Sequence, residues 1–321
     1  MDRWDRRLLE IVVAVTLDRL LGDPRDRYHP VAWFGRVASK LESLAYADSV
    51  LRGGAVWSFL VLPVAAAGTL GERSIAASAI GLWSTLGGRS LRAEAERIAN
   101  HLEAGDLDSA RASLRNLAGR DASELDQTEI ARAVIESVAE NSADAVIGPL
   151  AWHLLFGLRG SLTFRATNTL DAMFGHRNAA YLNFGRVSAR ADDLMVYLPA
   201  RFGAALVIPA ALSRSDPRVV FELWRRSREH PSPNAGRMEA LFAAVCRVDL
   251  GGVNLYRGEA VELPALLGGK EPSPQGIRCA VALSRRLELA LAAISLAALW
   301  RRRLTARRRG GSGGDVHGDD R

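Results

Sequence analysis

A ladder of carboxylates stands in the stretch IESVAENSADAVIGPL, residues 135–150. If this stretch is helical, Glu136, Glu140 and Asp144 are four residues apart and lie on one face. Like charges on one face repel one another, and more so near an apolar segment such as the one that follows. Because a divalent cation would turn this repulsion into attraction, the ladder predicts a metal site. The alternative is a solvated helix face.

A second polar stretch is FRATNTLDAMFGHRN, residues 164–178. On a helix, Asn168 and Asp171 share a face, and Arg165 lies one turn before Asn168. Gly175 is expected to end this helix and to leave His176 and its neighbours at the mouth. Helix capping or a hydrogen bond between helices is the alternative for Asn168 and Asp171.

Two more polar stretches follow. RVSARADDLMVYLPAR, residues 186–201, holds the pair Asp192 and Asp193 among arginines, and HPSPNAG, residues 230–236, begins with His230. The first could be a surface ion-pair cluster and the second a rigid turn. What the four stretches share is oxygen ligands mixed with arginine.

This combination of residue types favours one kind of chemistry. Carboxylate and amide oxygens suit Mg²⁺, which keeps several waters and binds through one or two carboxylates and substrate phosphates. Arginine offers a planar fork that binds phosphate or carboxylate. The sequence therefore predicts a site for a Mg²⁺–phosphate complex and a second anionic substrate. Cys246 and Cys279 lack metal-ligand spacing, so zinc is not expected.

The elements that must position these residues are helical and partly apolar. Of the 321 residues, 48% are hydrophobic, and the mean hydropathy is +0.01. Residues 54–71 carry no charge and approach the ~20 residues needed to cross a bilayer. With residues 74–88 they are expected to form a hairpin in the membrane. Shorter apolar blocks, expected as buried or re-entrant helices, lie at 145–158, 196–212 and 287–300.

Between these blocks the chain turns polar. Residues 89–144 have helical spacing with a break at AGD, residues 104–106. Ser123 followed by Asp126 predicts a capping box, and Ile130, Val134 and Val138 form an apolar stripe beyond it. Strand patterns are almost absent.

The predicted fold class is all-α: a multi-pass integral membrane helical bundle with polar helical segments and loops on the cytoplasmic side. One membrane-embedded domain is expected over residues 1–309, with a polar helical insertion at about 89–144. A disordered Gly-rich tail is expected over 310–321.

Charge and cysteines bear on location. The net charge is +6, and the basic run RRRLTARRR, residues 301–309, follows an apolar block. The positive-inside rule places such a run in the cytoplasm. No nucleic-acid motif or aromatic-basic platform accompanies the charge, so nucleic acid is not an expected partner. With only two cysteines, no disulfide framework is expected, and a reducing compartment fits.

Taken in order, these stretches carry a family resemblance. LDRLLGDP, HPVAWFGR, IESVAENSADAVIGPL, RATNTLDAMFGHRN, FGRVSARADDLMVYLPAR, HPSPNAG and LGGVNLYRG run from residue 17 to 258. The sequence resembles the adenosylcobinamide-phosphate synthases of cobalamin biosynthesis, the CbiB/CobD family. Its departures are small: Ser142 and Gly148 stand where Thr and Ala are expected, and His176 where Tyr is common.

The resemblance implies an enzyme of the cytoplasmic membrane. It would join (R)-1-amino-2-propanol, or its O-phosphate, through an amide to the free propionate carboxyl of adenosylcobyric acid. It further implies ATP and Mg²⁺ as cofactors. Expected partners are the corrinoid, the aminopropanol unit, membrane lipid and other late corrin-pathway membrane enzymes. The sequence has no P-loop, kinase-type Gly-rich loop or other evident ATP-binding pattern, so ATP rests on the resemblance alone.

The residues then receive expected roles. The expected metal ligands are Glu136, Glu140, Asp144, Asn168 and Asp171. The expected phosphate- and substrate-binding residues are Arg165, Arg177, Arg190 and Asn178. The expected catalytic residues are His230, Asp192 and Asn234, with His230 or Asp192 as the base that deprotonates the amine. Two rivals stay open: an intramembrane Mg²⁺-dependent prenyl or diphosphate transferase, and a non-catalytic membrane scaffold or sensor.

Overall fold

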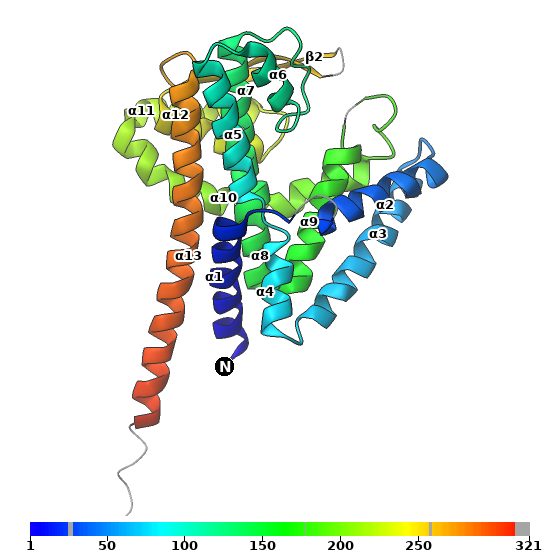
Figure 1. Ribbon diagram of the computed structural model, residues 1–321, viewed down its shortest axis with the longest axis vertical. Helices are drawn as coiled ribbons and strands as arrows, with labels where there is room; N and C mark the ends of the chain where they lie inside the picture. Colours follow the sequence, from blue (N-terminus) through cyan, green and yellow to red (C-terminus); the bar gives the residue numbers. More distant parts are fainter. Residues whose placement is uncertain (25–27, 177, 257–258, 312–321) are drawn as a thin grey trace, which may run out of the picture.

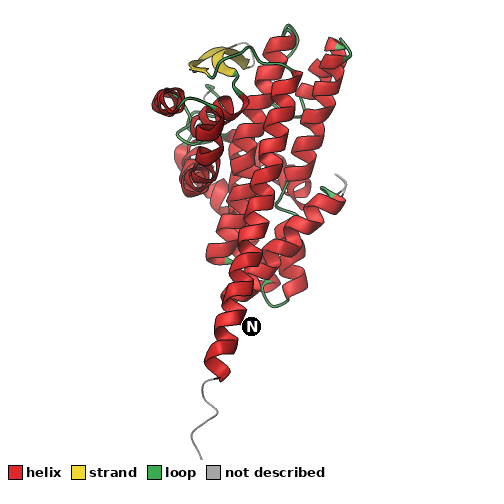
Figure 2. Cartoon of the chain, turned by 90° about the vertical axis from the view of Figure 1, so that its left-hand side faces the viewer, coloured by secondary structure: helices red, strands yellow, loops and turns green. Residues whose placement is uncertain are grey.

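The computed structural model describes residues 1–24, 28–176, 178–256 and 259–311. The chain is mostly helical, as predicted, but it also has a two-stranded antiparallel sheet, which was not predicted (Figure 2). The α-helices are α1 (Arg3–Leu21), α2 (Pro30–Ala45), α3 (Val50–Gly71), α4 (Ile75–Trp83), α5 (Gly88–Glu103), α6 (Leu107–Leu114), α7 (Gln127–Ser142), α8 (Gly148–Phe156), α9 (Leu158–Phe174), α10 (Arg186–Arg214), α11 (Pro217–Arg226), α12 (Ala235–Cys246) and α13 (Pro274–Gly311). A π-helical turn (Ala143–Ile147), a 3₁₀ turn (Ser227–Glu229) and strands β1 (Asp249–Tyr256) and β2 (Glu259–Leu267) complete the elements.

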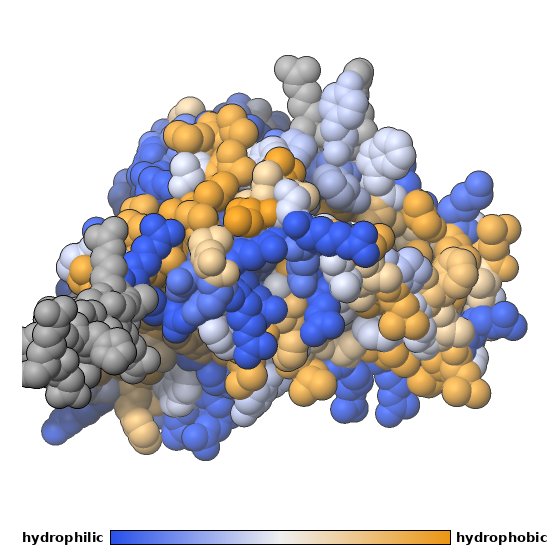
Figure 3. Space-filling model, turned by 90° about the horizontal axis from the view of Figure 1, so that it is seen from below, coloured by the Kyte–Doolittle hydropathy of each residue, from blue (hydrophilic) through white to orange (hydrophobic). Residues whose placement is uncertain are grey.

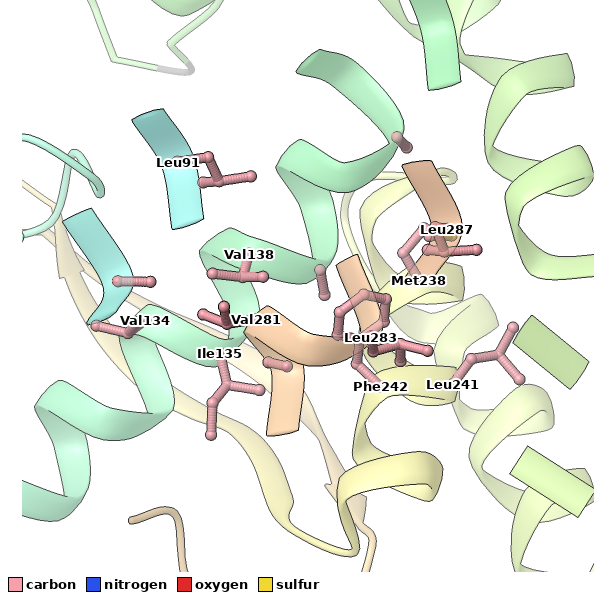
Figure 4. Packing of buried hydrophobic residues seen from close by; sticks show 14 of the residues in the cluster. Leu91, Val134, Ile135, Val138, Met238, Leu241, Phe242, Val281, Leu283 and Leu287 are labelled. Atoms are coloured by element: carbon pink, nitrogen blue, oxygen red, sulfur yellow. The ribbon is translucent and has the colours of Figure 1, made fainter. Parts of the chain in front are cut away.

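The polar helices α5, α6 and α7 and the β1–β2 hairpin lie at one end of the molecule, and α1, α4 and α8 lie toward the other (Figure 1). The core between α5, α7, α12 and α13 is shown in Figure 4. The predicted stripe Ile130, Val134 and Val138 is fully buried there, and burial of such aliphatic side chains stabilises each by roughly 1.5–3 kcal/mol. The predicted break is also present, since α5 ends before residue 104 and α6 begins after residue 106.

The start of α7 corrects one prediction. The Asp126 side chain accepts from the Glu129 backbone N–H at 2.8 Å, and Glu129 accepts in return from the Asp126 N–H at 2.9 Å. The capping box therefore starts at Asp126. The Ser123 hydroxyl instead donates to Asp121 at 2.8 Å, because the loop turns there before the helix begins.

The carboxylate ladder does not lie on one continuous α-helix. A π-helical turn, Ala143–Ile147, separates α7 from α8. Such a turn accommodates an extra residue and rotates the side chains that follow it, and it is frequent at functional sites. Glu136 and Asp144 therefore face different surroundings. Sequence spacing assumed 3.6 residues per turn throughout, so it missed this rotation.

Gly148 follows the π turn and lies against the ring of Phe164 in α9. A β-carbon at residue 148 would overlap the Phe164 ring. We expect Gly148→Ala to reduce the free energy of unfolding by about 1–3 kcal/mol, because the packed ring must shift. Thermal denaturation should detect this loss, and Phe164→Leu in the same chain should restore part of it. Equal stability of Gly148→Ala and the parent protein would contradict the packing.

Among the described residues, two helices, α3 and α10, are long and apolar enough to cross a membrane by length and composition. Exposed side chains on α3 such as Phe59, 68% exposed, agree with association with a membrane. Seen from below, hydrophobic residues are frequent on the side where α3 lies (Figure 3). The predicted hairpin partner, α4, has nine residues, about 14 Å of helix, and is too short to cross a bilayer.

Two expectations at the C-terminal end need correction. Cys246 at the end of α12 and Cys279 in α13 form a disulfide with Cα atoms 5.7 Å apart, although no disulfide was expected. The hairpin of β1 and β2 returns the chain and brings the two helices together, which spacing alone does not reveal. The basic run 301–309 belongs to α13, which continues to Gly311, and the rest of the expected tail, 312–321, lies outside the described residues.

Candidate functional site

The four polar stretches meet at one cavity of about 220 Å³. Its carboxylates come from α7, the π turn, α9 and α10, and the loop before α12 closes it. The lining residues are Glu140, Ala143, Asp144, Asp171, Gly175, Ala189, Asp192, Asp193, Val196, Pro231, Ser232, Asn234 and Ala235. Three of the five expected metal ligands, Glu140, Asp144 and Asp171, are among them. We call this space the acidic cavity.

Burial and mutual repulsion dominate the electrostatics of the acidic cavity. Burial and the nearby Asp171 carboxylate raise the pKa of Glu140. Burial and Asp193 raise the pKa of Asp171 to about 6. Carboxylates gathered in this way disfavour their charged forms unless a cation compensates them. The donor set therefore suits a bound cation or an ammonium group.

Asn168 bridges two carboxylates of the acidic cavity. Its amide nitrogen lies 3.3 Å from Asp144 Oδ2 and 3.2 Å from Asp192 Oδ1, and donates to both. Its Oδ1 accepts from Arg165 Nη1 at 3.5 Å. Asn168 was expected as a metal ligand and Arg165 as a phosphate-binding residue; in the structure Asn168 contacts the two carboxylates and Arg165 contacts Asn168. Gly175 ends α9 as predicted, and a β-carbon there would overlap the Asp171 carboxylate.

The loop before α12 forms one wall of the acidic cavity. Asn234 donates from Nδ2 to the backbone carbonyl of Asp193 at 2.9 Å, and its Oδ1 accepts from Arg201 Nη1. The Asn234 amide, expected to be catalytic, thus ties the loop to α10. Ser232, which sequence reasoning did not single out, accepts from the Ala235 backbone N–H at 3.2 Å and holds the start of α12. Its position beside the two prolines was the available sequence signal.

His230 faces away from this wall. Its Nδ1 accepts from the Ser232 backbone N–H at 3.0 Å, and its Nε2 lies 3.6 Å from Glu239 Oε2. His230 Nε2 and Glu239 Oε2 are both buried, and neither atom has a hydrogen-bond partner within the described residues. Burial lowers the pKa of His230. Burial and the nearby Glu136 carboxylate raise the pKa of Glu239 well above its usual range. Of the two expected bases, Asp192 is the one that lines the acidic cavity.

Glu136 has a different environment from the rest of the ladder. Its two oxygens accept from Arg120 Nη2 at 2.7 Å and from the Gly251 backbone N–H at 2.8 Å. Arg120 also donates to Asn254 Oδ1 at 2.8 Å, so this buried cluster fixes β1 to α7. Gly251 has φ +83°, a conformation that favours glycine. Both carboxylate oxygens of Glu136, which was expected as a metal ligand, therefore have hydrogen-bond partners within the chain.

A second cavity of about 500 Å³, the arginine cavity, adjoins the acidic one and shares Gly175, Ala189 and Asp193 with it. Arg186 and Arg190 of α10 line it. Arg190 was expected to bind phosphate, and it lines this cavity. The side chain of Asn178 instead accepts from the Tyr181 backbone N–H at 3.0 Å. Arg177 lies outside the described residues.

The carboxylates surround the acidic cavity without converging on a single point. Within the described ranges, no group of three or more His, Cys, Asp or Glu side chains is close enough to hold an ion unaided. An ion bound here would need waters or substrate oxygens among its ligands.

The fold is a helical bundle in which an acidic cavity and an arginine-lined cavity lie side by side. The comparisons with known proteins name the family. Residues 11–284 match the family model described as CobD/Cbib protein, so the chain belongs to the CobD/CbiB family.

Several curated relatives are named cobalamin biosynthesis protein CobD. One from Mycobacterium tuberculosis is 40% identical over 308 residues, covering 94% of this chain and 98% of the relative. One from Chromobacterium violaceum is 39% identical, covering 90% and 96%. One from Geobacter metallireducens is 37% identical, covering 80% and 85%. No solved structure matches the chain significantly.

Proposed function

We propose that this protein acts in cobalamin biosynthesis and joins aminopropanol O-phosphate, or aminopropanol, to the free propionate carboxyl of adenosylcobyric acid. Family membership and the names of the relatives support the pathway. The observation that carries the reaction is the contact between the acidic and arginine cavities at Gly175, Ala189 and Asp193. A small molecule with an ammonium group at one end and a phosphate at the other matches this arrangement.

In this proposal the two ends of the amine substrate bind to opposite charges. Arg186 and Arg190 would bind its phosphate, because a guanidinium group pairs with phosphate oxygens through charge-assisted hydrogen bonds. Asp193 on the shared wall would attract the ammonium group. The amine must lose a proton before it attacks the carboxyl carbon, and Asp192 in the acidic cavity would accept that proton.

Amide formation also needs an activated carboxyl group and charge compensation. A carboxylate and an amine form a salt in water, so a carboxylate oxygen must first become part of a leaving group, which ATP would provide. Glu140, Asp144 and Asp171 would hold Mg²⁺ through waters and substrate phosphate, and the ion would neutralise phosphate charge.

We further propose that the enzyme lies in the cytoplasmic membrane with several crossings and a cytoplasmic basic C-terminal end. The lengths and composition of α3 and α10 support insertion. The positive-inside rule supports the orientation of the arginines near residue 301.

A direct assay tests the proposed reaction. Membranes containing the protein are incubated with adenosylcobyric acid, labelled aminopropanol phosphate, ATP and Mg²⁺, or with labelled prenyl diphosphate in a parallel reaction. We expect label in a corrinoid amide only in the first reaction and only with ATP. Failure to restore growth on cobyric acid in a strain that grows on cobinamide, with the protein inserted, would contradict the proposal.

A further inference from the structure

A basic pocket lies apart from the two cavities of the candidate site, where the end of α1 and the start of α5 meet α13. Its volume is about 330 Å³. We call it the α1–α5–α13 pocket. Its lining residues are Arg19, Arg89, Arg92, Ala93, Glu96 and Arg285, none of which lines the acidic or the arginine cavity.

Positive charge is in excess around this pocket. Arg19 and Arg92 share one carboxylate, that of Glu288, at 3.4 and 2.8 Å. Arg285 pairs with Glu96 at 3.0 Å. The third carboxylate is that of Asp18, fully buried and 3.9 Å from Arg92. Four guanidinium groups thus face three carboxylates.

The hydrogen bonds of the arginines leave donors for a ligand. The Arg89 guanidinium donates from Nη1 to the backbone carbonyls of Arg19 and Leu20. Arg19 and Arg285, whose side chains are 35% and 50% exposed, each use one guanidinium nitrogen in the ion pairs above. The Nη1 of Arg92 has no hydrogen-bond partner in the part of the chain that the structure describes, but it is buried beside Gly88. A phosphate group bears the negative charge and the acceptor oxygens that this pocket lacks.

Apolar surface begins directly beside the pocket. Leu20 follows Arg19 and is 69% exposed, and Leu289, one turn after Arg285, is 44% exposed. Further along α13, the exposed large apolar residues include Ile294, Leu296 and Trp300. In Figure 1, α13 continues beside α1 and beyond it, away from the polar end. A ligand in the pocket therefore has an apolar path next to it.

Arginines return at the far end of this apolar segment. Arg285 and Arg302 are 17 residues apart on one helix, which is about 25 Å. Arg302 pairs there with Asp2 and with Asp5, the latter at 2.7 Å. The apolar surface beside the pocket is therefore bounded by arginines at both ends.

We propose that the α1–α5–α13 pocket binds the phosphate of an anionic phospholipid, whose acyl chains lie along the apolar surface of α13. The proposal rests on the membrane location given under the proposed function. Basic pockets between membrane helices bind anionic head groups in this way. Soluble phosphates offer the same charge without the apolar chains, so the lipid matches both features of the surface.

The test uses the full chain purified in neutral detergent, without corrinoid or amine. Its thermal transition is measured during titration with short-chain phosphatidylglycerol, phosphatidylcholine, ATP or inorganic phosphate. We expect a saturable rise in Tm with phosphatidylglycerol only. Arg285→Ala should weaken the apparent affinity about fivefold, the value of one interfacial arginine.

Arg278→Ala is the matched control, because Arg278 lies two turns before Arg285 and pairs with Glu103 of α5 at 2.7 Å. Both variants lose one exposed ion pair, but only Arg285→Ala alters the pocket. Equal lipid affinity in both variants, an equal response to phosphatidylcholine, or a response to ATP or phosphate alone would overturn the proposal. Because no substrate is present, an enzyme with another reaction could still bind the lipid, so the two proposals fail separately.

Discussion

Asp171→Asn is expected to lower kcat by about 100-fold or more, because it removes one charge from the acidic cavity without changing its shape. Asp171 lines the cavity next to Gly175, at the end of α9. In our proposal its carboxylate helps to hold Mg²⁺, so half-saturation should need a higher Mg²⁺ concentration. Steady-state kinetics of corrinoid amide formation across a Mg²⁺ titration measures both effects.

Glu136→Gln is the comparison that separates metal binding from folding. Glu136 belongs to the same predicted ladder, but its oxygens bind Arg120 and the Gly251 backbone. Loss of this buried charge should lower Tm, while the Mg²⁺ concentration for half-saturation stays as in the parent enzyme. Near-normal activity and Mg²⁺ dependence of Asp171→Asn would refute the role of the acidic cavity.

Arg190→Ala is expected to lower kcat/KM for aminopropanol phosphate by about 10- to 100-fold, the loss that follows removal of one charge-assisted hydrogen bond. Activity with free aminopropanol should change little, since that substrate has no phosphate to bind in the arginine cavity. Parallel assays with the two amines measure the difference.

Arg214→Ala, at the other end of α10, controls for general effects of removing an arginine from this helix. It should leave the ratio of the two kcat/KM values unchanged. If Arg190→Ala reduced activity equally with both amines, its role in phosphate binding would be wrong.

Much of the fold could be predicted because helical periodicity is local. The stripe Ile130, Val134 and Val138 and the break before α6 follow from spacing alone. The hairpin of β1 and β2 could not, because Gly251 and Gly252 adopt positive φ and form an irregularity that ordinary strand patterns do not contain. The Cys246–Cys279 disulfide depends on that hairpin and was missed with it.

The residues that meet at the acidic cavity were easier to predict than the direction in which each side chain points. Asp144, Asp171 and Asp192 come from three segments that meet at one cavity, and their residue types had marked them. Asn168 and Arg165 are residue types that also suit such a site, but their side chains form hydrogen bonds with neighbouring side chains. His230 lies next to residues that line the cavity but faces Glu239. Which way a side chain points depends on tertiary packing, so residue type and spacing do not determine it.

The π-helical turn after Ser142 separates Glu136, which lies before it, from Asp144, which lies within it, and the two carboxylates contact different parts of the molecule. Ahead of it, Glu136 anchors the hairpin, so changes there should appear as altered folding yield. Within it, Asp144 faces the space where substrates would meet, so changes there should appear as altered turnover. Deleting a single residue from the turn would restore regular α-helical geometry there. The chain should still fold, but the Asp144 carboxylate would no longer point into the acidic cavity.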